Sequence, residues 1–191
     1  MNIFKFRRMM LLSGRKMQGR PGEKEKCFVV KPRKAGEADI AILTAHHDAM
    51  FRELFELDGR PVEAAAFAAM GNGYREKLFR QLAEGTFVAW IIDAGTGVAA
   101  SAAVTFLEAV PVPMDPNYRI AFLHSVYTEP LYRRNGYAET LLVEAMRYCA
   151  EEGIRRIDLV ASDAGRPLYE KLGFKLSSSS MRYLSPAETY G

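Results

Sequence analysis

The chain has 191 residues, and 49% of them are hydrophobic. This length and composition predict one domain that buries its core without disulfides or a structural metal. Its two cysteines, Cys27 and Cys149, lack the spacing of a zinc knuckle or a redox motif, which favours reduced thiols in the cytoplasm. Neither a run of about 20 apolar residues nor a signal peptide is recognisable, so we expect a cytoplasmic protein without membrane association.

Positive charge is concentrated at the start of the chain. Residues 1–26 hold eight of the 26 Lys and Arg side chains but only two of the 23 Asp and Glu side chains. The remainder is slightly acidic, whereas a nucleic-acid-binding protein usually carries its positive charge on a folded face. We therefore expect no nucleic-acid partner, a disordered basic extension at 1–26 and a folded domain at 27–191.

The first half of the chain predicts a strand followed by helices. An apolar run at 28–31 indicates the strand, and apolar residues at helical spacing from 40 to 55 indicate a helix. A second helical pattern covers 61–85, but the glycines at 71 and 73 interrupt it. This segment therefore predicts either two helices or one broken helix.

The rest of the chain predicts a hairpin and then alternating strands and helices. Two apolar, β-branched segments at 86–93 and 98–110 flank turn residues, which indicates antiparallel pairing. The elements expected after them are a strand at 119–128, a helix from about 137 to 151, a strand at 156–161, a helix at 165–172 and a strand at 174–184. Strands that alternate with helices pair in parallel, so the expected fold is a single α/β (α+β) domain with a mixed sheet.

A candidate anion site lies between the 119–128 strand and the helix that follows it. In the segment Arg133 to Ala138 a strand has ended and a helix begins, and unpaired N–H groups and the helix dipole attract an anion at such a junction. Gly136 lets the main chain approach a ligand closely, and two arginines add positive charge. These six residues are typical of a diphosphate site and equally of a solvated basic loop.

The run LYEKLGF at 168–174 separates these alternatives. With this run one helix and one strand after Arg133–Ala138, the chain resembles the GCN5-related N-acetyltransferase superfamily. The resemblance is strongest over 119–184 and extends back to about residue 28. One departure is Thr128, which stands where Val or Ile is usual in that family.

This resemblance implies an acyl-CoA N-acyltransferase fold whose sheet is largely antiparallel with flanking helices. Its fourth and fifth strands, here 119–128 and 156–161, splay apart, and the pantetheine amides of acetyl-CoA pair with the freed edge. The implied contacts to acetyl-CoA are Val126, Tyr127, Thr128, Arg133, Arg134, Asn135, Gly136, Tyr137, Ala138 and Ser162. No metal is implied.

The resemblance also implies two catalytic side chains for direct transfer of the acetyl group to a primary amine. Tyr169 is the expected general acid, which protonates the departing thiolate. His124 matches a position that serotonin N-acetyltransferase uses as a base through water, with bulk water or a remote Glu as the alternative. We expect His46 and His47 to be exposed helical residues without a role.

The sequence leaves the class of the acceptor open. The expected acceptor is a small-molecule amine, and the alternatives are a peptide or protein amine, or a silent module that binds CoA without turnover. The sequence also leaves the oligomeric state open, with a homodimer as one alternative.

Overall fold

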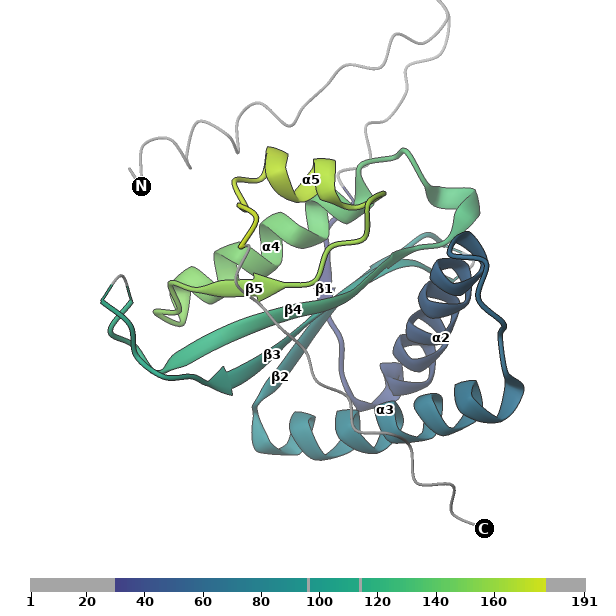
Figure 1. The fold of residues 1–191 in the computed structure, drawn as a ribbon, viewed down its shortest axis with the longest axis horizontal. Helices are drawn as coiled ribbons and strands as arrows, with labels where there is room; N and C mark the ends of the chain where they lie inside the picture. The colour runs from purple at the N-terminus through teal and green to yellow at the C-terminus, as the bar shows by residue number, and fades with distance from the viewer. Residues whose placement is uncertain (1–29, 96, 114, 178–191) are drawn as a thin grey trace, which may run out of the picture.

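The computed structural model describes residues 30–95, 97–113 and 115–177. Its helices are α2 (Ile40–Leu57), α3 (Ala64–Glu84), α4 (Tyr137–Glu151) and α5 (Arg166–Lys171), as Figure 1 shows. Its strands are β1 (Arg33–Lys34), β2 (Phe87–Asp93), β3 (Val98–Glu108), β4 (Arg119–Thr128) and β5 (Ile157–Leu159). Single turns of 3-10 helix at Glu37–Asp39 and Pro130–Tyr132 precede α2 and α4.

The strands form one sheet in the order β1-β2-β3-β4-β5. The first four strands pair antiparallel, and β4 and β5 pair in parallel across the helix α4. The predicted hairpin and the predicted mixed, largely antiparallel sheet are therefore confirmed.

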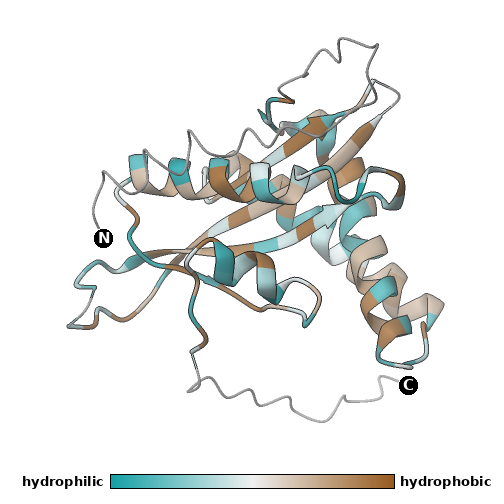
Figure 2. Cartoon of the chain, turned by 90° about the horizontal axis from the view of Figure 1, so that it is seen from above, coloured by the Kyte–Doolittle hydropathy of each residue, from teal (hydrophilic) through white to brown (hydrophobic). Residues whose placement is uncertain are grey.

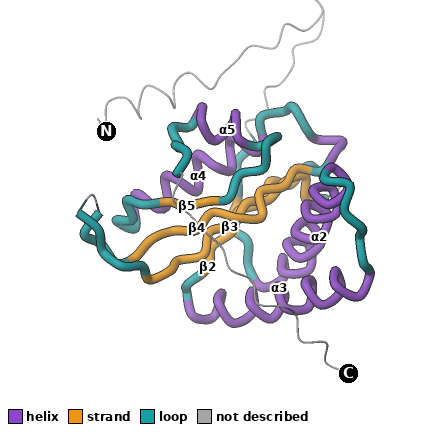
Figure 3. Tube along the Cα trace, in the orientation of Figure 1, coloured by secondary structure: helices purple, strands orange, loops and turns teal. Residues whose placement is uncertain are grey.

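Helices cover both faces of this sheet, with α4 and α5 on one side and α2 and α3 on the other (Figure 3). Side chains alternate across a strand, and β2 shows the consequence. Phe87, Ala89 and Ile91 pack with α2 and α3, whereas Trp90 and Ile92 pack with α4. Hydrophilic and hydrophobic residues alternate along the helices (Figure 2). This pattern is typical of amphipathic helices, which bury one side.

Two sequence predictions on the first half were wrong. Val30 and Lys31 are not in a strand, because the pairing with β2 begins only after Pro32, at Arg33. The segment 64–84 is one unbroken helix despite its two central glycines. Gly in a helix costs only about 1 kcal/mol relative to Ala. Buried Leu78 packs against β2, and buried Phe67 packs edge-on against Phe55 of α2, so contacts on either side of the glycines hold this helix in place.

The predicted last strand is only partly covered by the structure. Residues 174–177 are not in a strand, and residues 178–184 lie outside the described residues. The predicted extension at 1–26 also lies outside them.

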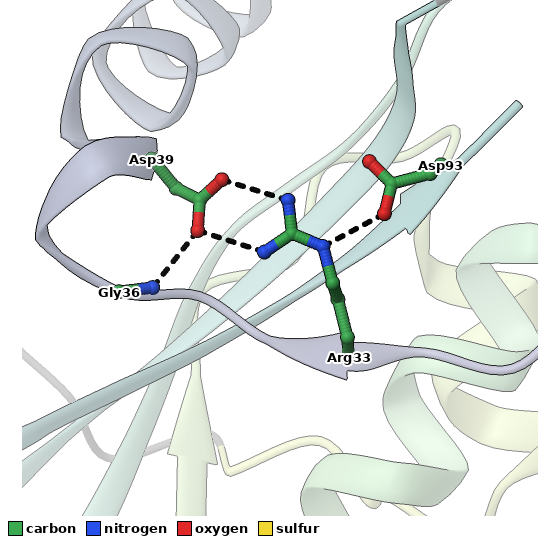
Figure 4. Close-up of polar contacts among 4 residues, drawn as sticks. All are labelled: Arg33, Gly36, Asp39 and Asp93. Carbon is green, nitrogen blue, oxygen red and sulfur yellow. Dashed lines mark hydrogen bonds and ion pairs between the residues drawn. The ribbon is translucent and has the colours of Figure 1, made fainter. Parts of the chain in front are cut away.

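An arginine fixes the start of α2 against the sheet (Figure 4). Arg33 on β1 donates two hydrogen bonds of 2.9 Å to Asp39 and one of 2.7 Å to Asp93 at the end of β2. Asp39 also accepts a 2.9 Å bond from the amide of Gly36, and its pKa is lowered chiefly by Arg33. These paired hydrogen bonds join the residue that precedes α2 to β1 and to the end of β2.

Candidate active site

The sheet opens between its two parallel strands. β4 pairs with β5 only at Ala121, Phe122 and Leu123, whereas β4 itself continues to Thr128. Within the described residues, no strand pairs with that edge of β4 after Leu123. Apart from the carbonyl of Thr128, which accepts a hydrogen bond from Arg133, the N–H and C=O groups of this edge are therefore available to an extended ligand, which would bind as an added strand does.

A β-bulge in β4 accompanies the opening. Ala103 of β3 pairs with His124 and Ser101 pairs with Tyr127, so β4 has one residue more than β3 in this interval. Ser125 in the bulge has a φ of 52°, which is uncommon for a residue other than Gly. A bulge bends the strand and increases its twist, which carries the end of β4 away from β5.

The start of α4 is the second part of the site. Gly136 is its N-cap with a φ of 77°, and Arg134 has a φ of 66°. No side chain caps this helix, and within the described residues the amides from Arg134 to Ala138 have no acceptor. A row of open N–H groups at the start of a 15-residue helix fits a diphosphate.

Arg133 and Arg134 differ in what their side chains contact. Arg133 donates to both carboxylate oxygens of Glu53 on α2, at 2.6 and 2.7 Å, and to the carbonyl oxygen of Thr128 at 2.9 Å. Arg134 is exposed and forms no ion pair within the described residues. The structure therefore leaves Arg134 open to an anion, whereas Arg133 joins the turn to α2.

The other residues of this turn support its conformation. Asn135 donates a 3.1 Å hydrogen bond from its side-chain amide to the carbonyl oxygen of Tyr132. Tyr137 opens α4 with its ring 6.5 Å from that of Tyr132, and Ala138 follows it in the first turn.

The end of β4 contacts both layers. Val126 packs against the core on the α4 side. The hydroxyl of Tyr127 donates a 3.0 Å hydrogen bond to Glu53 on the α2 side, while Thr128 accepts from Arg133 through its carbonyl. Contacts on both faces of the sheet therefore fix the positions of residues 126–128, so their main-chain groups are already ordered for a ligand.

Tyr169 lies on the short helix α5, which is tied to the start of α4. Lys171 of α5 pairs with Glu139 in the first turn of α4 at 2.6 Å. The ring of Tyr169 is half-buried and packs edge-on against Phe174 at 5.8 Å, and its hydroxyl has no hydrogen-bond partner within the described residues. Burial raises the pKa of Tyr169, so the phenol keeps its proton at neutral pH.

Ser162 has a structural contact. Its side-chain oxygen accepts from the amide of Gly165 at 3.2 Å, and its carbonyl accepts from Arg166 at 3.0 Å. Ser162 thus shapes the turn that leads into α5, and through this turn it positions Tyr169.

The prediction that His46 and His47 are exposed was wrong. His46 is 1% exposed, and its Nδ1 lies 2.8 Å from the hydroxyl of Ser101 on β3. His47 is half-buried, lies 2.8 Å from the hydroxyl of Ser125, and stacks on Tyr74 with a centroid separation of 3.8 Å. Sequence reasoning missed them because two consecutive helical residues rarely both face a sheet, and here the bulge brings Ser125 within reach.

His124 also has both ring nitrogens in contact with hydroxyl groups. Its Nδ1 lies 3.0 Å from Ser125 Oγ, and its Nε2 lies 2.8 Å from Thr105 Oγ1. Burial, with the charge of Lys77 as a smaller cause, lowers the pKa of His124 to about 3. The imidazole is therefore neutral at physiological pH.

A separate cavity of about 410 Å³ lies at the other end of β5, beside Ile157. It is lined by Asp115, Met146, Arg155, Arg156, Ile157, Leu172, Gly173, Phe174 and Lys175. The opening between β4 and β5 begins after Leu159, so this basic cavity is distinct from it.

An open edge beside an uncapped helix start, in a mixed sheet with helices on both faces, defines the class of acyl-CoA-dependent acyltransferases. A family model described as the acetyltransferase (GNAT) family matches residues 40–174. The chain belongs to this family and is an acyltransferase.

Solved structures agree with this assignment. A GCN5-related N-acetyltransferase from Ralstonia eutropha JMP134 is 26% identical with a TM-score of 0.73, covering 82% of this chain and 99% of that chain. A predicted acetyltransferase with acetyl-CoA from Clostridium acetobutylicum is 28% identical with a TM-score of 0.70, covering 81% of this chain and 95% of that chain. Glucosamine-6-phosphate N-acetyltransferase from Arabidopsis thaliana shares the fold, with 15% identity and a TM-score of 0.58. The match covers 82% of this chain and 98% of that chain.

Among curated proteins, none matches the chain significantly. Of the helices in the described ranges, none is both long and apolar enough to cross a membrane. The described residues also contain no cluster of three or more His, Cys, Asp or Glu side chains suited to a metal ion.

Proposed function

We propose that this chain transfers the acetyl group of acetyl-CoA directly to a primary amine of a small molecule. The observation that carries the proposal is the free edge of β4 at residues 124–128 beside the open amides at Arg134 to Ala138. The similar acetyltransferase from Clostridium acetobutylicum has acetyl-CoA in its structure, which supports the same co-substrate here.

The chain's own groups supply the chemistry that this transfer needs. Main-chain groups of Val126 and the N–H of Thr128 hold the pantetheine arm, and the amides around Gly136 hold the diphosphate, with Arg134 adding charge. A β4 N–H stabilises the negative charge that develops on the acetyl oxygen when the amine attacks. Tyr169 donates its proton to the thiolate that leaves.

A small acceptor is favoured by what covers the other face of β4. Stacked rings of His47 and Tyr74 lie over Ser125, with Phe51 edge-on to His47 at 4.9 Å. Because packed rings cover this face of β4, we infer a small acceptor, since an extended peptide needs an open groove.

An acceptor panel tests the proposal. Release of the CoA thiol would be followed with polyamines, amino acids, aminoglycosides and short lysine-containing peptides at matched concentrations. We expect kcat/KM for the best small amine to exceed that of every peptide. Preference for a peptide would identify a protein N-acetyltransferase, and CoA binding without any acceptor-dependent thiol release would identify a silent CoA-binding module.

A further inference from the structure

Five side chains from α2, α3, β3 and β4 form a continuous chain of hydrogen bonds on the acceptor side of the sheet. His47 Nδ1 lies 2.8 Å from Ser125 Oγ, and Ser125 Oγ lies 3.0 Å from His124 Nδ1. His124 Nε2 lies 2.8 Å from Thr105 Oγ1, which in turn accepts from Lys77 Nζ at 2.8 Å. We call these residues the polar chain.

The hydroxyl groups of Ser125 and Thr105 each have one proton, so each donates one hydrogen bond at a time. Ser125 accepts a 3.1 Å hydrogen bond from the hydroxyl of Tyr74, so it has one more acceptor position and one proton for its two histidine neighbours. It therefore donates to one imidazole and accepts from the other. Since both histidines are neutral, the polar chain has two arrangements of its protons that satisfy every contact.

The ends of the polar chain are chemically different. His47 Nε2 has no hydrogen-bond partner within the described residues and is not among the buried unpaired atoms, so this nitrogen is not fully buried and a ligand can reach it. Lys77 is half-buried over the ring of Phe87 at 5.2 Å and forms no ion pair with a carboxylate within the described part of the chain. An amine without a counter-ion in such a place can lose its proton near neutral pH.

We propose that the polar chain is the proton relay that deprotonates the acceptor amine, with His47 as its entrance and Lys77 as its terminal base. This inference rests on the proposed function. It assigns a role to His47, Ser125, Thr105 and Lys77, and it makes His124 a carrier inside the relay instead of a base that becomes an imidazolium.

The transfer balances step by step. The attacking ammonium gives one proton to His47 Nε2, and His47 Nδ1 gives its proton to Ser125. Ser125 gives its own proton to His124 Nδ1, and His124 Nε2 passes its proton to Thr105. Thr105 gives its proton to neutral Lys77, which becomes an ammonium and is the only member of the relay whose charge changes.

The charges around the relay agree with this direction. Burial first and Arg80 second lower the pKa of Lys77 to about 8. Burial first and Lys77 second lower the pKa of His47 to about 4, against the smaller opposite effect of Asp48. Lys77 thus faces Arg80 on its own helix, His47 on α2 and His124 on β4, and it lies 5.6 Å from the ring of Tyr74. A proton is therefore more stable on Lys77 than on either histidine.

The first test uses Lys77→Met and Lys77→Arg. Arg has the positive charge and the donors of the lysine but does not release its proton, so a structural role for Lys77 would be preserved and a basic role lost. We expect both variants to lower kcat about 10²-fold at pH 8, within the range for loss of general base catalysis. The wild-type kcat should rise with pH and level off above about 8, whereas in the variants it should keep rising because hydroxide takes the proton.

The second test uses Thr105→Val, which removes the hydroxyl at constant shape, with Thr105→Ser as its matched control. The Val variant should lose about 10²-fold in kcat and the Ser variant should stay within about threefold of the wild type. Melting temperature and CoA affinity check that each variant is folded, and Lys77→Arg carries the test if Thr105→Val is not. Parental kcat and an unchanged pH profile in Lys77→Arg would overturn the relay, whereas a folded wild type that acetylates no amine would overturn the proposed function itself.

Discussion

Replacing Tyr169 by Phe is expected to lower kcat about 10²–10⁴-fold, the usual range for the loss of a general acid. The ring packs edge-on against Phe174, a contact that Phe would retain, and the hydroxyl has no hydrogen bond within the described residues whose loss would destabilise the fold. CoA affinity and KM should therefore change little, which marks an interaction made chiefly in the transition state. Steady-state kinetics with the best acceptor from the panel would measure this.

Tyr118→Phe is the matched control for that substitution. Tyr118 is 62% exposed and lies outside the site, so removal of its hydroxyl should leave kcat and KM unchanged. If Tyr169→Phe acetylated its acceptor at the parental rate under conditions where chemistry limits turnover, the proton for the thiolate would come from another group or from water.

Gly136→Val is expected to abolish measurable CoA binding. Gly136 has a φ of 77°, a conformation that costs a residue with a Cβ about 1–2 kcal/mol, and the added side chain would occupy the open side of the turn that we assign to the diphosphate. Calorimetric titration with CoA would measure the affinity, and circular dichroism would confirm that the variant is folded.

Gly153→Val separates the loss of stability caused by a side chain at positive φ from the blocking of the diphosphate turn. Gly153 ends the same helix with a φ of 73°, and a Cβ there also meets open space. The variant should therefore lose a similar amount of stability but bind CoA as the wild type does. Tight CoA binding by folded Gly136→Val would contradict the assignment of the diphosphate to this turn.

Local patterns in the sequence were sufficient for most of the fold. The strand at 119–128 and the helix that follows Gly136 have the predicted bounds within a few residues, because their apolar periods and turn residues agree with the tertiary structure. The glycines of α3 misled the prediction because packing against the sheet outweighs a propensity cost of about 1 kcal/mol per glycine.

The polar chain could not be predicted from the sequence. It joins His47 to Ser125 and Lys77 to Thr105, pairs that are 78 and 28 positions apart, and only the packing of α2 and α3 on the sheet brings them together. The pairing of Arg133 with Glu53 on α2 was missed for the same reason, since the motif alone assigned that arginine to the cofactor.

Amide NMR during a titration with acetyl-CoA tests the central claim most directly, because it locates the ligand on the folded chain. We predict that the largest shift changes fall on the amides of residues 126–128 and 134–138, at the free edge of β4 and the start of α4. Changes confined to the basic cavity beside Ile157, around Arg155, Arg156 and Lys175, would contradict the site. A spectrum unchanged at saturating acetyl-CoA would contradict the proposed function as well.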